Sequence, residues 1–275
     1  MAALSSTLAG RLSSAVARLL SPRWLDEPAA LADNSAMTGG LDILFAATVA
    51  FVGGHFLLSS TPVRSAVVGK VGEKTFLGYY SLIVTALFVW MLFAYRDAPL
   101  EILWDPVPGL AWVPAVVMPV ALFFAVCGLT TPNPTMAGSD ALSAGRDPTQ
   151  GIMRITRHPF LNGVALWAVA HLLASIDTAN LILFGGLLVL AAGGMWHIDK
   201  KKEAQHGADW GPVLLTTSAV PFAALLQKRT TFDAPGIGWW RVVVTVVFYL
   251  ALVWLHPFAL GAEAWPGMGF IWVFF

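Results

Sequence analysis

The sequence predicts an all-α membrane protein, a polytopic bundle of about six transmembrane helices preceded by an N-terminal interfacial helix. Two observations carry this prediction. Of the 275 residues, 57% are hydrophobic and only 12% are charged, about half the charged fraction of a soluble domain. The apolar residues also gather in six runs close to the ~20 residues that a helix needs to cross a membrane. The net charge of zero gives no reason to expect a nucleic-acid partner.

The six predicted spans follow one another from the first third of the chain to its end. They are Leu41–Ser59, Phe76–Tyr95, Leu110–Leu129, His158–Ile176, Ala179–His197 and Trp240–Phe258. Residues 37–262 are therefore expected to form one transmembrane domain, surrounded by membrane lipid.

The two ends of the chain differ from this domain. Residues 1–36 place leucines at helical spacing among serines and arginines, which favours an amphipathic helix lying in the membrane interface. The alternative is a disordered extension, with Met37 as the natural start. Residues 263–275 are rich in Trp and Phe, and we expect this aromatic tail at headgroup depth.

Orientation follows from the lysines and arginines, most of which lie in the segments after the first, third and fifth spans. Because positive residues favour cytoplasmic loops, both termini are expected outside the cytoplasm. The expected location is a bacterial inner membrane, crossed several times.

Four histidines lie within or at the ends of the predicted spans: His55, His158, His171 and His197. Ionisable side chains inside a bilayer are costly, so each one is a candidate functional residue. Histidine pairs in a helical bundle are typical of haem sites, whereas zinc would need accompanying cysteines or carboxylates. The simpler alternative for each histidine is a hydrogen bond to the backbone of a neighbouring helix.

The block from Gly151 to His171 contains the most polar of these positions. Thr156 is placed to cap the following helix, and Pro159 suits its first turn. We therefore expect Arg157 and His158 at the cytoplasmic mouth, where helix N–H groups favour an anion such as a haem propionate. Alternatively, Arg157 extends to a lipid phosphate.

The same block, with its Arg157-His158-Pro159 and Ala170-His171 sequences, resembles the NnrU family of membrane proteins. It is also similar to the family's plant and cyanobacterial relative, 15-cis-ζ-carotene isomerase. His55 within Gly54-His55-Phe56, the stretch 217–224 and His256-Pro257 extend the resemblance over roughly residues 41–261. It implies haem b held by His55 and His171, and either a role in denitrification or isomerase or redox chemistry on a lipophilic substrate.

Helix geometry argues against that pair of ligands, because the two histidines are expected at different depths. His55 should lie ~6 Å from the inner end of the first span, and His171 ~20 Å along the fourth span from the same side. His197 with His55 or His158 is the pair whose depths match. The chain also has Ala94-Tyr95-Arg96 where the isomerase carries a histidine, which puts carotene isomerisation in doubt.

A second resemblance gives a competing function. Arg157-His158-Pro159 with Gly163, followed by Asp199, is similar to membrane methyltransferases of the isoprenylcysteine and phospholipid type. In that reading Arg157 and His158 would help to hold S-adenosylmethionine. The adjacent glutamates of those enzymes are missing, and lysines 200–202 stand in that region. A non-enzymatic membrane assembly factor is the third possibility.

Overall fold

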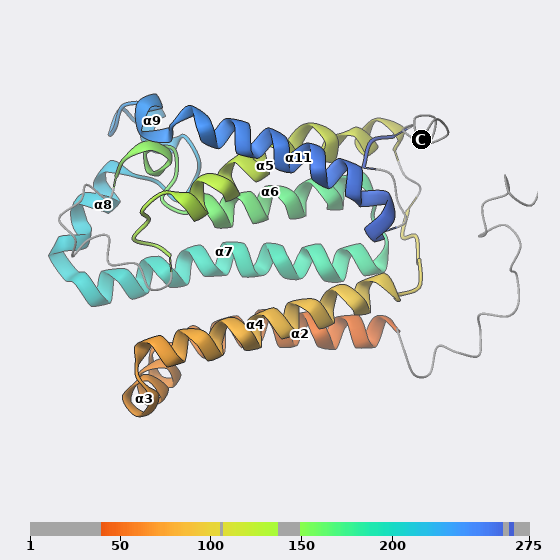
Figure 1. Cartoon of the computed structure of the whole chain (residues 1–275), viewed down its shortest axis with the longest axis horizontal. Coiled ribbons are helices and arrows are strands. Elements are labelled where there is room, and N and C mark those ends of the chain that lie inside the picture. The colour runs from red at the N-terminus through yellow and green to blue at the C-terminus, as the bar shows by residue number, and fades with distance from the viewer. Residues whose placement is uncertain (1–39, 105–106, 137–148, 261–263, 267–275) are drawn as a thin grey trace, which may run out of the picture.

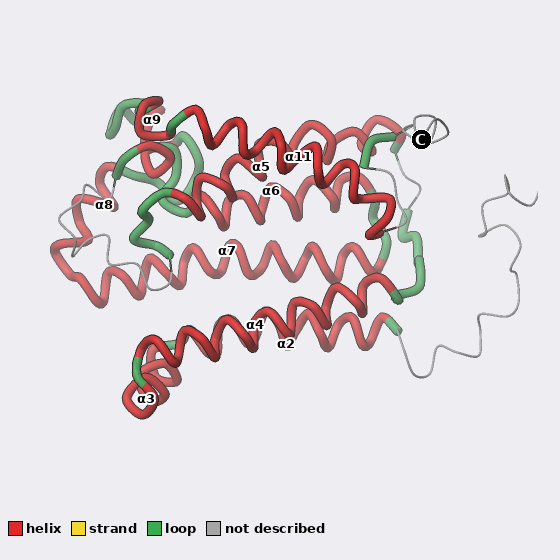
Figure 2. Tube along the Cα trace, viewed as in Figure 1, coloured by secondary structure: helices red, strands yellow, loops and turns green. Residues whose placement is uncertain are grey.

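The computed structural model describes residues 40–104, 107–136, 149–260 and 264–266. This described part consists of helices and connecting loops, and none of it forms a named strand (Figure 2). The predicted all-α class is therefore confirmed. The interfacial helix expected in residues 1–36, and most of the aromatic tail 263–275, lie outside the described residues.

Six long helices pack side by side along a common direction (Figure 1). They are α2 (Leu41–Ser59), α4 (Glu73–Arg96), α5 (Val113–Thr130), α6 (Pro159–Ala174), α7 (Thr178–His206) and α11 (Trp239–Leu260). Shorter α-helices are α3 (Thr61–Val71), α8 (Gly211–Thr216), α9 (Ala223–Leu226) and α10 (Ala234–Ile237). Three 3-10 helices cover Pro108–Trp112, Gly151–Arg154 and Gly207–Trp210.

Five of the described helices are long and apolar enough to cross a membrane, which supports a multi-pass membrane protein. The exception is α6, whose 16 residues span only ~24 Å. It ends early because Ser175 is extended and Asp177 then caps α7 by accepting the N–H of Asn180. The prediction of about six spans therefore agrees with five helices of full spanning length and one shorter apolar helix.

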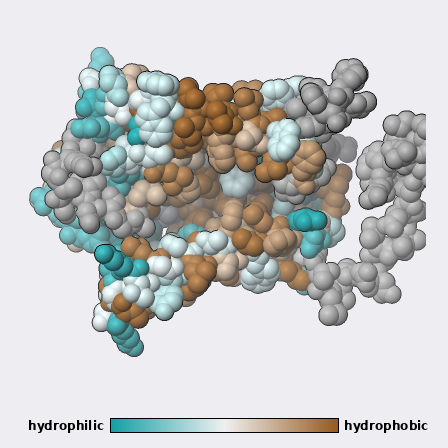
Figure 3. Space-filling model, in the orientation of Figure 1, coloured by the Kyte–Doolittle hydropathy of each residue, from teal (hydrophilic) through white to brown (hydrophobic). Residues whose placement is uncertain are grey.

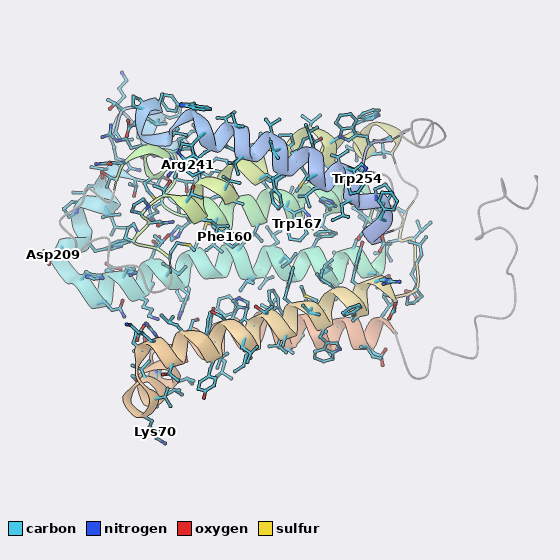
Figure 4. The ribbon with its side chains drawn as sticks, in the orientation of Figure 1. Lys70, Phe160, Trp167, Asp209, Arg241 and Trp254 are labelled. Carbon is cyan, nitrogen blue, oxygen red and sulfur yellow. The ribbon has the colours of Figure 1, made fainter. Side chains whose placement is uncertain are left out.

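The short helices mark one end of the bundle as polar. Helices α3, α8 and α9 all lie at this end, and α7 runs nine residues past its predicted end at His197 (Figure 1). Hydrophilic residues gather at this end, whereas hydrophobic residues cover the middle of the surface (Figure 3). Lys70 and Asp209 both lie at this polar end (Figure 4). Which compartment it faces stays a prediction.

Helices α5 and α6 approach each other closely because glycines stand at their contact. A Cβ on Gly163 would lie 2.6 Å from the backbone oxygen of Ala121, and one on Gly128 would lie 2.6 Å from the nitrogen of Phe160. Small residues allow such close helix contacts in membranes. This contact fixes the start of α6, where the candidate site begins.

Helix α7 lies between two groups of helices, with α2 and α4 on one side and α5, α6 and α11 on the other (Figure 1). Leu44 and Ala47 of α2, Met91 of α4, and Leu183 and Leu187 of α7 form a buried core on the first side. Side chains on different faces of α7 therefore meet different neighbours.

Candidate functional site

The first turn of α6 is held by a hydrogen-bonded polar cluster. Thr156 was expected to cap this helix, but the helix begins at Pro159 and His158 occupies the cap position. The Thr156 hydroxyl instead accepts the backbone N–H of His158 at 3.2 Å and donates to the carbonyl of Ala219 at 3.0 Å. The amide of Asn162 also donates to Thr156 and to Ala219, at 2.9 Å each. The segment before α6 is thereby tied to the segment after α8.

Asp199 of α7 binds the two cationic side chains of this segment. The Arg157 guanidinium donates to both carboxylate oxygens, from Nε at 2.9 Å and from Nη2 at 2.5 Å. His158 Nε2 lies 2.9 Å from Oδ1 of the same carboxylate. The side chains of Arg157 and His158 are 13% and 0% exposed. The structure therefore gives both residues a carboxylate partner inside the protein, where the sequence favoured an external anion.

A cavity of about 600 Å³ opens between α2, α4, α6 and α7, within the usual size range of ligand pockets. Much of its wall is aromatic, with Phe51 from α2, Phe88 from α4, and Phe160 and Trp167 from α6. Figure 4 shows the last two, Phe160 and Trp167, on α6. Three of the four histidines named from the sequence line it, namely His55, His158 and His197. His171 is not on its wall.

His55 and His171 have the same local geometry in different places. Nδ1 of each ring bonds the backbone carbonyl four residues earlier, at 2.9 Å to Phe51 and 3.0 Å to Trp167. Such a bond orients the imidazole and leaves Nε2 as the ligating atom, as in many metal sites. His171, however, stacks on Phe184 with ring centroids 4.8 Å apart, one turn beyond the cavity wall.

Contacts along α7 measure the depth of both rings. A Cβ on Gly193 would lie 2.8 Å from the Phe56 ring, whereas His171 stacks on Phe184. His55, one residue before Phe56, is therefore about eight residues of α7, or ~12 Å, from the level of His171. This separation agrees with the mismatch in depth expected from the sequence.

His197 completes the set of imidazoles on the cavity. Its ring lies 6.3 Å from the Phe56 ring, and its Nε2 is buried with no hydrogen-bond partner among the described residues. His55 and His197 thus bring imidazoles from two helices to one apolar cavity, a donor set that fits a haem iron. Within the described ranges, no group of three or more His, Cys, Asp or Glu could hold a metal ion.

The structure adds a cationic group that sequence reasoning had assigned only to the loops. Arg64 of α3 and Lys201 and Lys202 of α7 line the cavity at the polar end, and we call these three residues the cationic mouth. Lys201 follows His197 by four residues, so the two share one face of a continuous helix. The four-residue spacing of His197 and Lys201 could have predicted that both side chains reach one cavity. It was not used because α7 was expected to end at His197.

Comparison with known proteins agrees with the resemblance seen in the sequence. Residues 43–264 match the family described as "NnrU protein". The chloroplastic 15-cis-zeta-carotene isomerase of Arabidopsis thaliana is 37% identical over 79 residues, which is 29% of this chain and 22% of that protein. The corresponding Zea mays protein is 34% identical with the same coverage, so the match spans only 22% of the length of these relatives. No solved structure matches. Because the family match covers most of the chain, the protein belongs to the NnrU family.

Proposed function

We propose that this NnrU protein binds haem b in the cavity between α2, α4, α6 and α7 and acts on a lipophilic molecule from the membrane. The observation that carries the proposal is an aromatic cavity of about 600 Å³ with histidines from separate helices on its wall. The names of the two relatives support an isomerase. Their partial match leaves the substrate to be inferred from the cavity.

His55 and His197 are the proposed axial ligands, because both line the cavity and Nε2 of each has no hydrogen-bond partner among the described residues. Phe51, Phe88 and Trp167 would then pack against the porphyrin. Bound haem would supply a redox-active iron, so the chemistry is an isomerisation or a redox reaction. The pair His55 and His171 is the alternative that the family resemblance implies. A link to denitrification rests on that resemblance alone.

The test is the visible spectrum of the detergent-purified protein, oxidised and then reduced with dithionite. A sharp Soret band with narrow α and β bands on reduction is expected for six-coordinate haem b. His55→Ala and His197→Ala should each abolish haem retention, whereas His206→Ala, at the polar end and off the cavity wall, should retain it. A colourless protein after expression with added haem precursor would refute the proposal.

His171→Ala decides between the two pairs of ligands. Retention of the reduced spectrum in this variant, with loss in His197→Ala, supports the pair on the cavity. Loss of the spectrum in His171→Ala, with retention in His197→Ala, assigns the iron to His55 and His171. The helices would then have to shift so that the ~12 Å difference in depth between these two rings disappears. Methyl transfer ranks lower, because the Arg157 guanidinium is already bound by Asp199.

We also propose that the polar end of the bundle faces the cytoplasm of a bacterial cell and that both termini lie outside it. The support is the positive charge gathered at that end, which includes Arg64 of α3 and lysines 200–202 of α7. Reporter fusions placed after Gly72 and after Ala98 should give opposite signals, with the first cytoplasmic. Equal signals, or the reverse order, would contradict this orientation.

A further inference from the structure

We propose that the cationic mouth is a carboxylate-binding site that holds the acidic group of the molecule filling the apolar part of the cavity. The inference deepens the proposed function, because it concerns the same cavity. It names a chemical class of occupant, an amphiphile with a carboxylate on a large apolar body.

The charge on the cavity wall supports an anionic occupant. Arg64, Lys201 and Lys202 line the cavity, and no described Asp or Glu does so. Arg64 and Lys202 both repel the charge of Lys201, and Glu73 attracts it. Glu73 is itself paired with Arg64. A bound carboxylate would therefore offset a repulsion among cations that the described side chains only partly balance.

The contacts of the mouth hold its cations in place. Lys201 Nζ donates to the backbone oxygen of Ser59 at 3.1 Å, which joins α7 to the end of α2. The Arg64 guanidinium lies over the Phe76 ring, 5.6 Å from its centroid. Both positions are set by protein contacts, while an ammonium with three N–H groups and a guanidinium with five have further donors to offer.

The wall changes from polar to apolar with distance from the mouth. Ser59 and Gln205 line the cavity near the polar end, and Phe51, Val84 and Leu187 line it deeper in the bundle. A pure hydrocarbon would cover the mouth without bonding it. The Lys201 ammonium, whose hydrogen bond goes to the neutral backbone oxygen of Ser59, would then lose its contact with water, which is costly for a charged group. A carboxylic acid with a large apolar body satisfies both ends. Such a group exists on haem, as its propionates, and on free fatty or isoprenoid acids of the membrane.

The experiment compares acids with their esters on the full-length detergent-purified protein. The first pair of probes is haemin and haemin dimethyl ester, and the second is cis-parinaric acid and its methyl ester. We expect at least one acid to bind about 10-fold more tightly than its ester, the effect of losing a charge-assisted hydrogen bond. Lys201→Gln should reduce that preference to about 2-fold or less.

Lys200→Gln is the matched control. Lys200 is the neighbouring residue of α7, but its side chain is 63% exposed, pairs with Glu203 and does not line the cavity. This variant should keep the preference of the wild type. Because Lys201 also holds the end of α2, Lys202→Gln serves as a second variant of the mouth, with the same direction expected, should Lys201→Gln fail to fold.

The outcomes separate this inference from the proposed function. A preference for free haemin identifies haem propionates as the bound acid. A preference for parinaric acid in a protein that binds no haemin supports the carboxylate site and refutes the haem. Equal affinity for acid and ester in both pairs, or no binding of either acid, overturns the inference. Equal losses in Lys200→Gln and Lys201→Gln would also overturn it, because they would show general surface attraction.

Discussion

Near the polar end, α7 turns one face toward α6 and another toward the cavity, and the charged groups on these faces have different surroundings. On the α6 face, Asp199 binds Arg157 and His158 at 2.5–2.9 Å. On the cavity face, Lys201 lies near the cations Arg64 and Lys202, and Nε2 of His197 is buried with no partner among the described residues. Neighbouring residues of one helix thus belong to different kinds of site.

This difference separates structural polar groups from candidate binding groups. A buried charge with all its partners in place specifies the arrangement of the helices around it. A buried polar atom without a partner costs free energy, and a ligand can recover that cost. The comparison therefore assigns Arg157 and Asp199 to the scaffold and makes His197 a candidate binding group.

The largest expected effect comes from removing the carboxylate that Arg157 and His158 share. Asp199→Ala leaves the Arg157 and His158 side chains without their shared carboxylate, and both are largely buried. We expect the free energy of unfolding to fall by about 3 kcal/mol, the usual cost of removing one partner of a buried pair. Unfolding in detergent, followed by circular dichroism, measures it. Glu203→Ala, which removes the exposed partner of Lys200, should change stability by less than about 0.5 kcal/mol. Equal effects of the two variants would contradict the assignment.

The close contact between α5 and α6 should be nearly as sensitive to substitution. In Gly163→Ala the new methyl group would meet the backbone of α5, at 2.6 Å from the oxygen of Ala121. Since backbone cannot move aside as a flexible side chain does, we expect a loss of about 2 kcal/mol. Gly185→Ala, a helical glycine with open space at its Cβ, should instead stabilise by up to about 1 kcal/mol. Thermal unfolding of both variants checks the prediction, and similar midpoints would refute it.

The two faces should also respond differently to a change of cation at constant charge. Arg157→Lys loses the two-pronged contact with Asp199, since an ammonium cannot reproduce the planar fork. We expect stability to fall by about 1 kcal/mol. Lys201→Arg keeps the charge at the mouth and should leave acid binding within about 2-fold of the wild type. If Arg157→Lys leaves the stability unchanged, the two-pronged geometry of the contact with Asp199 does not contribute to the fold, and this difference between the two faces of α7 is refuted.

The smallest effect concerns Asp233, a carboxylate in the loop before α10 whose hydrogen bonds come from backbone N–H groups. Asp233 accepts the N–H groups of Gly151 and Gly236 at 2.8 and 3.0 Å, which hold its pKa below the usual value. Its ionised form therefore stabilises the fold above the unfolded pKa of about 3.9, and the contribution is lost as pH falls through the folded pKa.

Asp233→Asn measures that contribution. The variant should be less stable than the wild type by a few tenths of a kcal/mol at pH 7, because Asp233 is partly solvent-exposed. The difference should shrink as pH is lowered from 5 toward 3 in parallel unfolding experiments. A difference that is constant with pH would show that the charge of Asp233 does not matter.

Much of the fold could be predicted because helix length and the cost of burying backbone in lipid are local properties of the sequence. The span Leu41–Ser59 coincides with α2, and the mismatch in depth between His55 and His171 followed from the rise per residue alone. The early end of α6 was missed, although Asp177 is a recognisable helix cap.

The sequence by itself determined the class of protein, the helices and the candidate histidines. Only the tertiary structure decided which of them meet: Asp199 with Arg157, 42 residues away, and Lys201 with the distant Arg64 on one cavity. The physical reason lies in the composition of the spans. A helix that is apolar all round carries no stripe to mark the side that faces a partner. The rotation of each helix, and with it the side chains that share a site, follows from packing between segments far apart in the chain.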